Sequence, residues 1–310
     1  MEMIRLLISL ATQMKWKIHQ LDVKSAFLNG YFEEEVYVEQ PLGFVVKNYK
    51  DEVLRCIDKY FQDNGFTHCL HEYALYLKVH TNGDIFLVCL YVDNLIFTGN
   101  NPSLFKAFKK DMSREFEMTD VELMSYYLGL EVKQMKDGIF ISQESYTNEI
   151  LKKFNILDCN PVNIPMESGT KLSKFNEGEK VDPTFFKSLV GSLRYLTCTR
   201  PTILFAVGVV SRFMEAPTST HLKVTRKILR YLKGTIDFGL FYSSFNDFNL
   251  KGFCDSDDAG DIDDRKSTTC FLFFLGDYVI SWSSKKQSIV TLSTCEAEYI
   301  AATSCTCHAI

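Results

Sequence analysis

Hydrophobic residues in the first half of the chain follow helical and strand spacing in turn. Helical spacing predicts helices over residues 3–14, 51–64, 103–117 and 143–154. Alternating or β-branched runs predict strands over residues 17–23, 34–39, 74–80, 84–92, 95–98, 126–134 and 138–142. The dipeptides Asn82-Gly83 and Asp137-Gly138 favour tight turns, so the strands on either side of each are expected to form hairpins.

The second half has a different pattern. Periodicity is lost between residues 155 and 183, where Asn, Pro, Gly, Lys and Glu predominate, and this segment is the predicted linker. Helical spacing then predicts helices over residues 183–198, 202–214 and 219–233. Strand patterns follow over residues 238–242, 249–256, 267–275 and 277–283, and a last helix begins at Ser293. The pattern indicates an α+β protein.

Length and composition narrow the class of protein. With 310 residues, 46% of them hydrophobic and 24% charged, the chain suffices for about two domains and is not disordered. Its net charge of −5 gives no general attraction for nucleic acid, so such a site has to be a local basic patch. The apolar runs at residues 86–92 and 203–210 are shorter than the ~20 residues needed to cross a bilayer. Arg5 interrupts the apolar segment 3–11, which indicates an amphipathic helix rather than a signal peptide. We therefore expect an intracellular protein, in the cytoplasm or nucleus, without membrane association.

The cysteines indicate a reducing compartment. None of the ten has C-x-x-C spacing, so we expect free thiols, most of them buried. Two short clusters combine histidine and cysteine, His68-Cys69-Leu70-His71 and Cys305-Thr306-Cys307-His308. Neither has a second pair of ligands at metal-binding spacing, so we expect no metal at either.

Two aspartates lie near the ends of predicted strands. Asp22 lies at the end of the strand at residues 17–23, and Asp93 lies in the turn Asp93-Asn94 between two adjacent strands. A carboxylate at the end of a buried strand is costly unless a positive group neutralises it. Two such carboxylates from neighbouring strands would suit Mg²⁺, which binds one or two carboxylates together with substrate phosphates. The other reading is that both aspartates are simply exposed at turns.

The predicted helix at residues 219–233 carries a basic stripe. Four basic side chains recur at i, i+3, i+4 and i+7 and share one face: Lys223, Arg226, Lys227 and Arg230. Four apolar side chains lie largely opposite: Leu222, Ile228, Leu229 and Leu232. Such a stripe could track a phosphate backbone, and a solvated surface helix would show the same pattern. The pair Lys285-Lys286 is a further candidate phosphate contact.

Five long stretches of the chain form distinctive motifs. Two lie in the first half, QLDVKSAFLNGYFEEEVYVEQPLGF at residues 20–44 and LYVDNLIFTGN at residues 90–100. Three lie in the second half, SLVGSLRYLTCTRP at 188–201, SRFMEAPTSTHLKVTRKILRYLKGT at 211–235 and DRKSTTCFLFFLGDYVISWSSKKQSIVTLSTCEAEYIAA at 264–302. Together they closely resemble the reverse transcriptase of copia-type LTR retrotransposons, and the resemblance covers nearly the whole chain.

The resemblance implies an RNA-directed DNA polymerase that uses an RNA template, a DNA primer and dNTPs. Asp22 matches the metal-binding aspartate of the family's first palm motif, and Asp93 matches the first aspartate of its Tyr-x-Asp-Asp hairpin. Together they would hold two Mg²⁺ ions for nucleotidyl transfer. Phe27 falls where the family places a bulky ring that excludes a ribose 2′-hydroxyl. Without the family, Phe27 would be read as an ordinary core residue.

The C-terminal motif resembles an RNase H domain. Asp255 lies inside an alternating strand that resembles the first catalytic strand of that domain, and Glu298 matches its catalytic glutamate. The resemblance implies that this pair binds metal for hydrolysis of the RNA strand of an RNA/DNA hybrid. Glu296 is expected to form a capping box with Ser293, which leaves Glu298 on a different face of the helix. Most of the other aspartates in this region are expected to lie in a solvated loop: Asp257, Asp258, Asp261, Asp263 and Asp264.

Four departures from the family bear on activity. Asn94 replaces the second aspartate of the hairpin, which suits the turn but removes one negative charge from the metal site. Between Phe44 and Cys56 the chain lacks a segment that contacts template and nucleotide in the family. The chain starts partway into the family's domain, without its basic fingers strands, and ends at Ile310 before another RNase H carboxylate.

These departures predict a truncated copy with little or no polymerase activity. The expected domains are a palm-like antiparallel sheet with helices at 1–154, a linker at 155–183, a helical connection at 184–248 and a truncated RNase H-like mixed sheet at 249–310. The alternative is a non-catalytic module that binds nucleic acid or a partner. A third reading is that the missing segment exposes the core, so that no stable protein forms.

Overall fold

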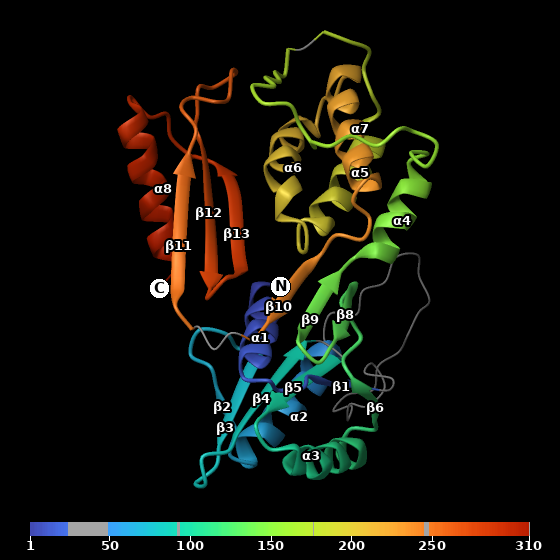
Figure 1. Cartoon of the computed structure of the whole chain (residues 1–310), viewed down its shortest axis with the longest axis vertical. Helices are drawn as coiled ribbons and strands as arrows, with labels where there is room; N and C mark the ends of the chain where they lie inside the picture. The colour runs from blue at the N-terminus through green and yellow to red at the C-terminus, as the bar shows by residue number, and fades with distance from the viewer. Residues whose placement is uncertain (24–48, 92–93, 176, 245–247, 310) are drawn as a thin grey trace. The chain divides into compact units, whose positions relative to one another are not determined.

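The chain divides into two compact units. The computed structural model describes residues 1–23, 49–91, 94–175, 177–244 and 248–309 (Figure 1). The first unit, here the sheet unit, consists of Leu10–Ser125. The second, here the helical unit, combines Met1–Ser9 with Tyr126–Ile310. The bounds of the four segments expected from the sequence remain predictions.

The sheet unit is built on an antiparallel sheet that has six strands within the described residues, in the order β2-β3-β4-β5-β1-β6. The strands are β1 (His19–Val23), β2 (Thr67–His68), β3 (Leu75–Val79), β4 (Ile85–Tyr91), β5 (Asn94–Gly99) and β6 (Met118–Leu123). Helices α2 (Tyr49–Asp63) and α3 (Pro102–Glu115) pack into one core with strand residues. Phenylalanine rings dominate this core, and the centroids of Phe86 and Phe108 lie 4.9 Å apart. Edge-to-face packing of this kind adds to the apolar burial.

Both hairpins predicted from turn dipeptides are confirmed. β3 pairs with β4 from Leu75↔Cys89 to Val79↔Ile85, and Gly83 has a φ of +86° that favours glycine. β8 (Leu130–Gln134) pairs with β9 (Gly138–Ser142) around the second dipeptide. The sequence did not predict β6, because every residue of that strand after Met118 is exposed and no alternation marks it. The strand predicted at 34–39 lies outside the described residues.

Four helices form the main core of the helical unit. They are α4 (Glu144–Lys153), α5 (Pro183–Leu196), α6 (Leu204–Val210) and α7 (Ser219–Lys233). The side chain of Asp182 accepts hydrogen bonds from the N–H groups of Thr184 and Phe185, which fixes the start of α5. The single helix predicted at 202–214 is wrong in detail, since 3₁₀ turns at Pro201–Ile203 and Ser211–Phe213 flank α6. Turns of this kind are common where helices begin and end.

Two antiparallel sheets complete the helical unit. One has the order β10-β9-β8-β7, with β7 at Tyr126–Tyr127 and β10 at Leu240–Ser243. The other consists of β11 (Leu250–Ser256), β12 (Thr268–Leu275) and β13 (Tyr278–Lys286), with α8 (Thr294–Ala309) packed along β11 (Figure 1). The mixed sheet expected here is not what the described residues form. Each strand is joined to the next by a loop without an intervening helix, a connection typical of antiparallel pairing.

Helix α1 (Glu2–Gln13) is amphipathic, as predicted, but its polar interruption points inward. Arg5 is only 4% exposed, whereas Leu6 beside it is 45% exposed. The buried side of the helix therefore includes a charged residue that needs partners. Within the described ranges, no helix has both the length and the apolar character required to cross a membrane.

The cysteines are free, as expected, but most are not buried. Of the ten thiols, only Cys89 and Cys305 are buried, and Cys56, Cys254, Cys295 and Cys307 are exposed. Cys254 shows why the expectation was wrong. It lies on β11, whose residues up to Asp255 are all exposed, so an apolar sequence run does not ensure burial.

Candidate functional site

The first acidic site lies where β1 and β5 pair. Asp22 is directly opposite Asn94 in the antiparallel register, so the two side chains share one face of the sheet. Asp22 is half-buried. Asp93 and Phe27, the other residues predicted for this site, lie outside the described residues, as does the chain from Phe44 to residue 48.

The amide of Asn94 is already engaged in a hydrogen bond. Nε2 of Gln20, a buried residue two positions before Asp22, donates to Oδ1 of Asn94 over 2.8 Å. Oδ1 of Asn94, at the position of the family's second hairpin aspartate, therefore accepts a hydrogen bond from an amide N–H. Sequence reasoning missed Gln20, which no motif singles out. Its position in a strand at i−2 from Asp22, and hence on the same face, was the only signal.

The packing of α8 on β11 brings Glu298 to the backbone beside Asp255. The Asp255 side chain shares the sheet face of Cys270, opposite the face on which Phe271 contacts α8. Oε1 of Glu298 accepts a hydrogen bond from the backbone N–H of Ser256 over 3.3 Å, next to Asp255. Both carboxylates are exposed. The capping box predicted at the start of α8 is present in altered form. Ser293 Oγ accepts from Glu296 N–H, while the Glu296 carboxylate accepts from the N–H of Leu292.

Gln287 links the two elements that carry this pair, and sequence reasoning missed it. Its Nε2 group donates to Ser256 Oγ over 3.2 Å, to Thr269 Oγ1 over 3.1 Å and to the carbonyl of Ala297 over 3.0 Å. Ser256 and Ala297 are the chain neighbours of Asp255 and Glu298. A single buried amide thus fixes the separation of β11 from α8 beside both carboxylates. A lone glutamine after two lysines gives no local signal of such a role.

The aspartate loop after β11 is not simply solvated. Asp261 is 5% exposed, and its Oδ2 atom accepts from Arg212 over 3.1 Å and from Lys286 over 2.9 Å. Its Oδ1 atom accepts from the N–H groups of Asp263 and Asp264. Burial alone would raise the pKa of Asp261, but the hydrogen bonds from Lys286 and from the backbone outweigh it and lower the pKa to about 2.

The two lysines at the end of β13 have different surroundings. Lys285 is exposed. Lys286 is half-buried, and its Nζ atom lies 2.8 Å from Asp264 Oδ2 in addition to its contact with Asp261. Lys286 therefore links two carboxylates of the aspartate loop through ion pairs. Lys285 is the member of the pair whose charge is directed to solvent.

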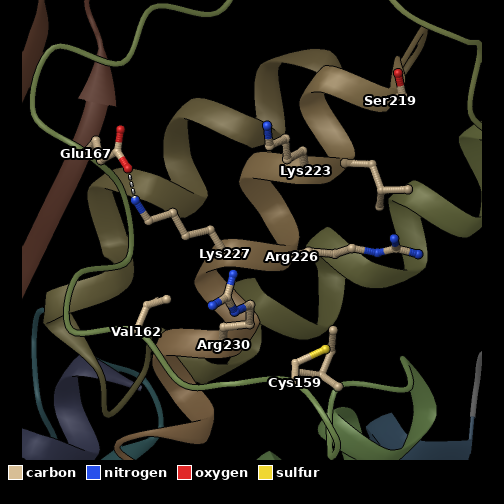
Figure 2. Close-up of a pocket in the computed structure, with 10 residues that line it drawn as sticks. Cys159, Val162, Glu167, Ser219, Lys223, Arg226, Lys227 and Arg230 are labelled. Atoms are coloured by element: carbon tan, nitrogen blue, oxygen red, sulfur yellow. Dashed lines mark hydrogen bonds and ion pairs between the residues drawn. The ribbon is translucent and has the colours of Figure 1, made fainter.

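The basic stripe of α7 lines a pocket (Figure 2). The cavity has a volume of about 560 Å³, and its walls include Lys223, Arg226, Lys227 and Arg230. Leu222, which we expected on the opposite face, also lines it. Ile228, Leu229 and Leu232 are fully buried in the helical core, as the pattern predicted. The pocket therefore combines four cationic side chains with an apolar floor.

The four basic side chains are not equivalent. Lys223 and Arg226 are exposed, and Lys227 and Arg230 are half-buried. Arg230 Nε donates to the carbonyl of Asn160 over 2.7 Å, and Lys227 Nζ lies 2.5 Å from Oε1 of Glu167. Two of the four cations thus bind the segment that crosses this face of the helix.

No three histidine, cysteine, aspartate or glutamate side chains gather into a possible metal site within the residues that the structure describes. His68, from one of the two histidine and cysteine clusters, instead binds Asp58, with Nε2 and Oδ1 2.6 Å apart. Cys305, from the second cluster, is a buried residue in the C-terminal part of α8.

Comparison with known proteins identifies the family. A family model described as reverse transcriptase (RNA-dependent DNA polymerase) matches residues 1–168. The retrovirus-related Pol polyproteins from transposons RE1 and RE2 of Arabidopsis thaliana are 36% and 37% identical to this chain over 313 residues, which is 96% of it and 21% of each relative. The polyprotein from transposon TNT 1-94 of Nicotiana tabacum is 38% identical over 329 residues, 98% of this chain and 25% of the relative. The chain thus spans about a fifth to a quarter of the length of these relatives. It belongs to the reverse transcriptase (RNA-dependent DNA polymerase) family and is related to the Pol polyproteins of copia-type retrotransposons.

Proposed function

We propose that this chain descends from a two-metal reverse transcriptase with an RNase H-like region and carries out little or no DNA synthesis itself. The observation that carries the proposal is the pairing of Asp22 with Asn94 across β1 and β5. Family members have a second hairpin aspartate where this chain has Asn94. The replacement leaves a neutral amide opposite Asp22, with its oxygen bound to Gln20.

The donor set fits one Mg²⁺ ion better than two. Asp22 and, by family, Asp93 would hold the metal, which when bound activates the primer 3′-hydroxyl and stabilises the leaving pyrophosphate. One or two carboxylates, together with substrate phosphates, are a usual ligand set for Mg²⁺. Two divalent ions facing two carboxylates instead of three leave more positive charge uncompensated. We therefore infer that binding of the second ion is the step weakened by Asn94.

A shortened active site is a second cause of low activity. The alignment with the TNT 1-94 polyprotein runs over 329 residues, more than the 310 of this chain. That relative therefore has residues inside the aligned region that this chain lacks. We place the gap between Phe44 and Cys56, where the family has a segment that contacts template and nucleotide.

Primer extension tests the proposal. A purified chain incubated with Mg²⁺, dNTPs and a DNA primer on an RNA template is expected to give no extended product. The variant Asn94→Asp restores a carboxylate and is also expected to stay inactive, because the missing segment is not restored. An active reverse transcriptase on the same template is the positive control. Efficient extension by the unmodified chain would refute the proposal.

We propose an RNase H-like role for the second acidic pair on the basis of its geometry. Support comes from the hydrogen bond between Glu298 and the N–H of Ser256, the residue that follows Asp255 on β11. Two carboxylates from a strand and a helix are suited to hold a divalent cation that activates water for attack on a phosphodiester. The test is cleavage of the RNA strand of a labelled hybrid. Cleavage that persists undiminished in Asp255→Asn would exclude this pair as its source.

The alternative is that the chain binds nucleic acid without catalysis. The specific observation in its favour is the pocket on α7, where Lys223 and Arg226 are exposed beside Lys227. Salt-dependent attraction of a phosphate backbone requires only such cations. A net charge of −5 does not oppose it, because the positive charge is local.

Neutralising the exposed part of the stripe is expected to weaken hybrid binding. The double variant Lys223→Gln/Arg226→Gln should reduce the slope of log K against log salt by up to about 1.8, because each lost phosphate contact contributes about 0.9. Fluorescence anisotropy of a labelled RNA/DNA hybrid at several salt concentrations measures this slope. The double variant Lys106→Gln/Lys110→Gln removes the same charge from exposed positions of α3 and should have little effect. If both double variants lose hybrid affinity equally, α7 is not a specific binding surface for the hybrid.

A further inference from the structure

The segment after α4 lies along the basic face of α7 and is held there by cations (Figure 2). Arg230 Nε donates to the carbonyl of Asn160, and Lys233 Nζ donates to the carbonyl of Cys159 over 2.7 Å. Ile156, Cys159 and Val162 of this segment form part of the pocket wall. Backbone carbonyls bound by arginine and lysine fix this part of the segment without adding negative charge.

Glu167 makes a different kind of contact. It is the one acidic residue among those that line the pocket in the described part of the chain, and its carboxylate binds Lys227 over 2.5 Å. The hydrogen bond from Lys227 lowers the pKa of Glu167 and so favours its carboxylate form. Its side chain is 73% exposed, whereas that of Lys227 is 23% exposed. An ion pair with one partner this exposed contributes little to stability, so the carboxylate can leave at low cost.

We propose that the pocket on α7 is a phosphate-binding site and that Glu167 occupies the position of the phosphate in the free protein. This rests on the proposed nucleic-acid-binding function, since the phosphate is assigned to the backbone of an RNA/DNA hybrid. Phosphate and carboxylate oxygens compete for the same Nζ donors of Lys227. Lys223 and Arg226, both exposed, add donors when the phosphate enters.

The apolar floor supports a nucleotide unit rather than an isolated inorganic ion. Leu222 and Val162 line the pocket beside the cations, where they would contact the carbon atoms of a sugar. A volume of about 560 Å³ lies within the range of small-ligand pockets. Glu167 then acts as a built-in competitor that makes binding weaker than the basic face alone would allow.

Removing the charge of Glu167 tests the proposal. The variant Glu167→Gln is expected to bind a labelled RNA/DNA hybrid about two- to fivefold more tightly at low salt, the range for an exposed ion pair. Its salt slope should steepen by up to about 0.9, the value for one further phosphate contact. The matched control is Glu179→Gln, which makes the same charge change in the same connection at an exposed residue outside the pocket.

The outcomes separate this inference from the function on which it rests. If hybrid binding depends on Lys223 and Arg226 but Glu167→Gln behaves like the wild type, nucleic-acid binding stands and the competitor role is refuted. Equal gains in Glu167→Gln and Glu179→Gln would also refute it, because the effect would then be one of net charge. Inorganic pyrophosphate, titrated by calorimetry, is the second probe. If Glu167→Gln binds pyrophosphate more tightly than the wild type but binds the hybrid no more tightly, the hybrid is not the occupant of the pocket.

Discussion

Replacing Asp261 by asparagine is expected to lower the free energy of unfolding of the helical unit by about 3 kcal/mol at neutral pH. The carboxylate is 5% exposed and accepts four hydrogen bonds, two from Arg212 and Lys286 and two from the backbone. Without its charge, Arg212 and Lys286 lose the carboxylate that they share, and Lys286 keeps its contact with Asp264. Chemical denaturation followed by circular dichroism measures the change.

The pH dependence of stability should identify the same residue. The folded pKa of Asp261 is about 2, below its value in the unfolded chain, so its contribution is complete above about pH 4. The contribution is lost as the pH falls from about 4 to about 2, and it is on the order of 2 kcal/mol. Asp261→Asn should therefore show a flatter stability profile in this interval than the wild type.

The matched control for Asp261→Asn is Asp258→Asn. Asp258 lies in the same loop but is exposed, so its replacement should change the free energy of unfolding by less than about 0.5 kcal/mol. Equal stability of the wild type and Asp261→Asn would show that the loop is not held by this carboxylate. A cooperative transition in the wild type would also exclude the reading that the chain forms no stable protein.

Replacing Arg5 by alanine is expected to cost about 3 kcal/mol of stability. The guanidinium donates to the carbonyl of Ile280 over 2.8 Å and to that of Cys198 over 3.1 Å, and it lies 3.9 Å from the ring centroid of Trp282. Ile280 is the residue that the ladder between β12 and β13 skips. The arginine side chain therefore binds a carbonyl at the point where the ladder is interrupted by a bulge.

Arg5 also completes the end of α5. Trp282 Nε1 donates to the carbonyl of Thr197, and Arg5 donates to the next carbonyl, that of Cys198. Carbonyls after the last turn of a helix lack partners within it, and a cation there is favourable. Loss of Arg5 removes the side-chain donor from the carbonyls of Cys198 and Ile280 and opens a cavity beside Trp282. The fluorescence of Trp282 should accordingly shift to longer wavelength in Arg5→Ala.

Two further variants make the Arg5 prediction specific. Arg5→Lys retains the charge but not the planar fork, so it should recover only part of the lost stability. Leu6→Ala changes the neighbouring residue, which is 45% exposed, and should cost less than about 0.5 kcal/mol. Urea unfolding monitored by tryptophan fluorescence compares all three. The prediction fails if Arg5→Ala unfolds at the same urea concentration as Leu6→Ala.

The predicted sites differ in how far the sequence could define them. The basic stripe of α7 was found from spacing alone, because i, i+3, i+4 and i+7 positions share a face in any helix. Spacing could not show that Arg230 and Lys227 bind Asn160 and Glu167, which lie 70 and 60 positions earlier in the chain. Whether a cation is available to a ligand depends on such distant partners.

The fold shows the same division. The hairpin of β3 and β4 was predictable because a local dipeptide sets both the turn and the register. β6 was not, because an edge strand exposed along nearly its whole length has no pattern of its own and forms by pairing with β1. The buried position of Arg5 could likewise not be predicted from the sequence, because its acceptors lie 193 and 275 residues away.

The sequence by itself determined the family, most of the helices and strands, and the presence of an amide at position 94 in place of an acid. These are encoded locally, in motifs and in periodicities that repeat within a few residues. Only the tertiary structure decided that Asn94 faces Asp22, that Asp261 is buried among cations and that Glu167 covers Lys227. Electrostatic and hydrogen-bond partners are chosen when distant segments pack together, because a charge that loses water must find a counter-charge or a donor wherever the fold provides one.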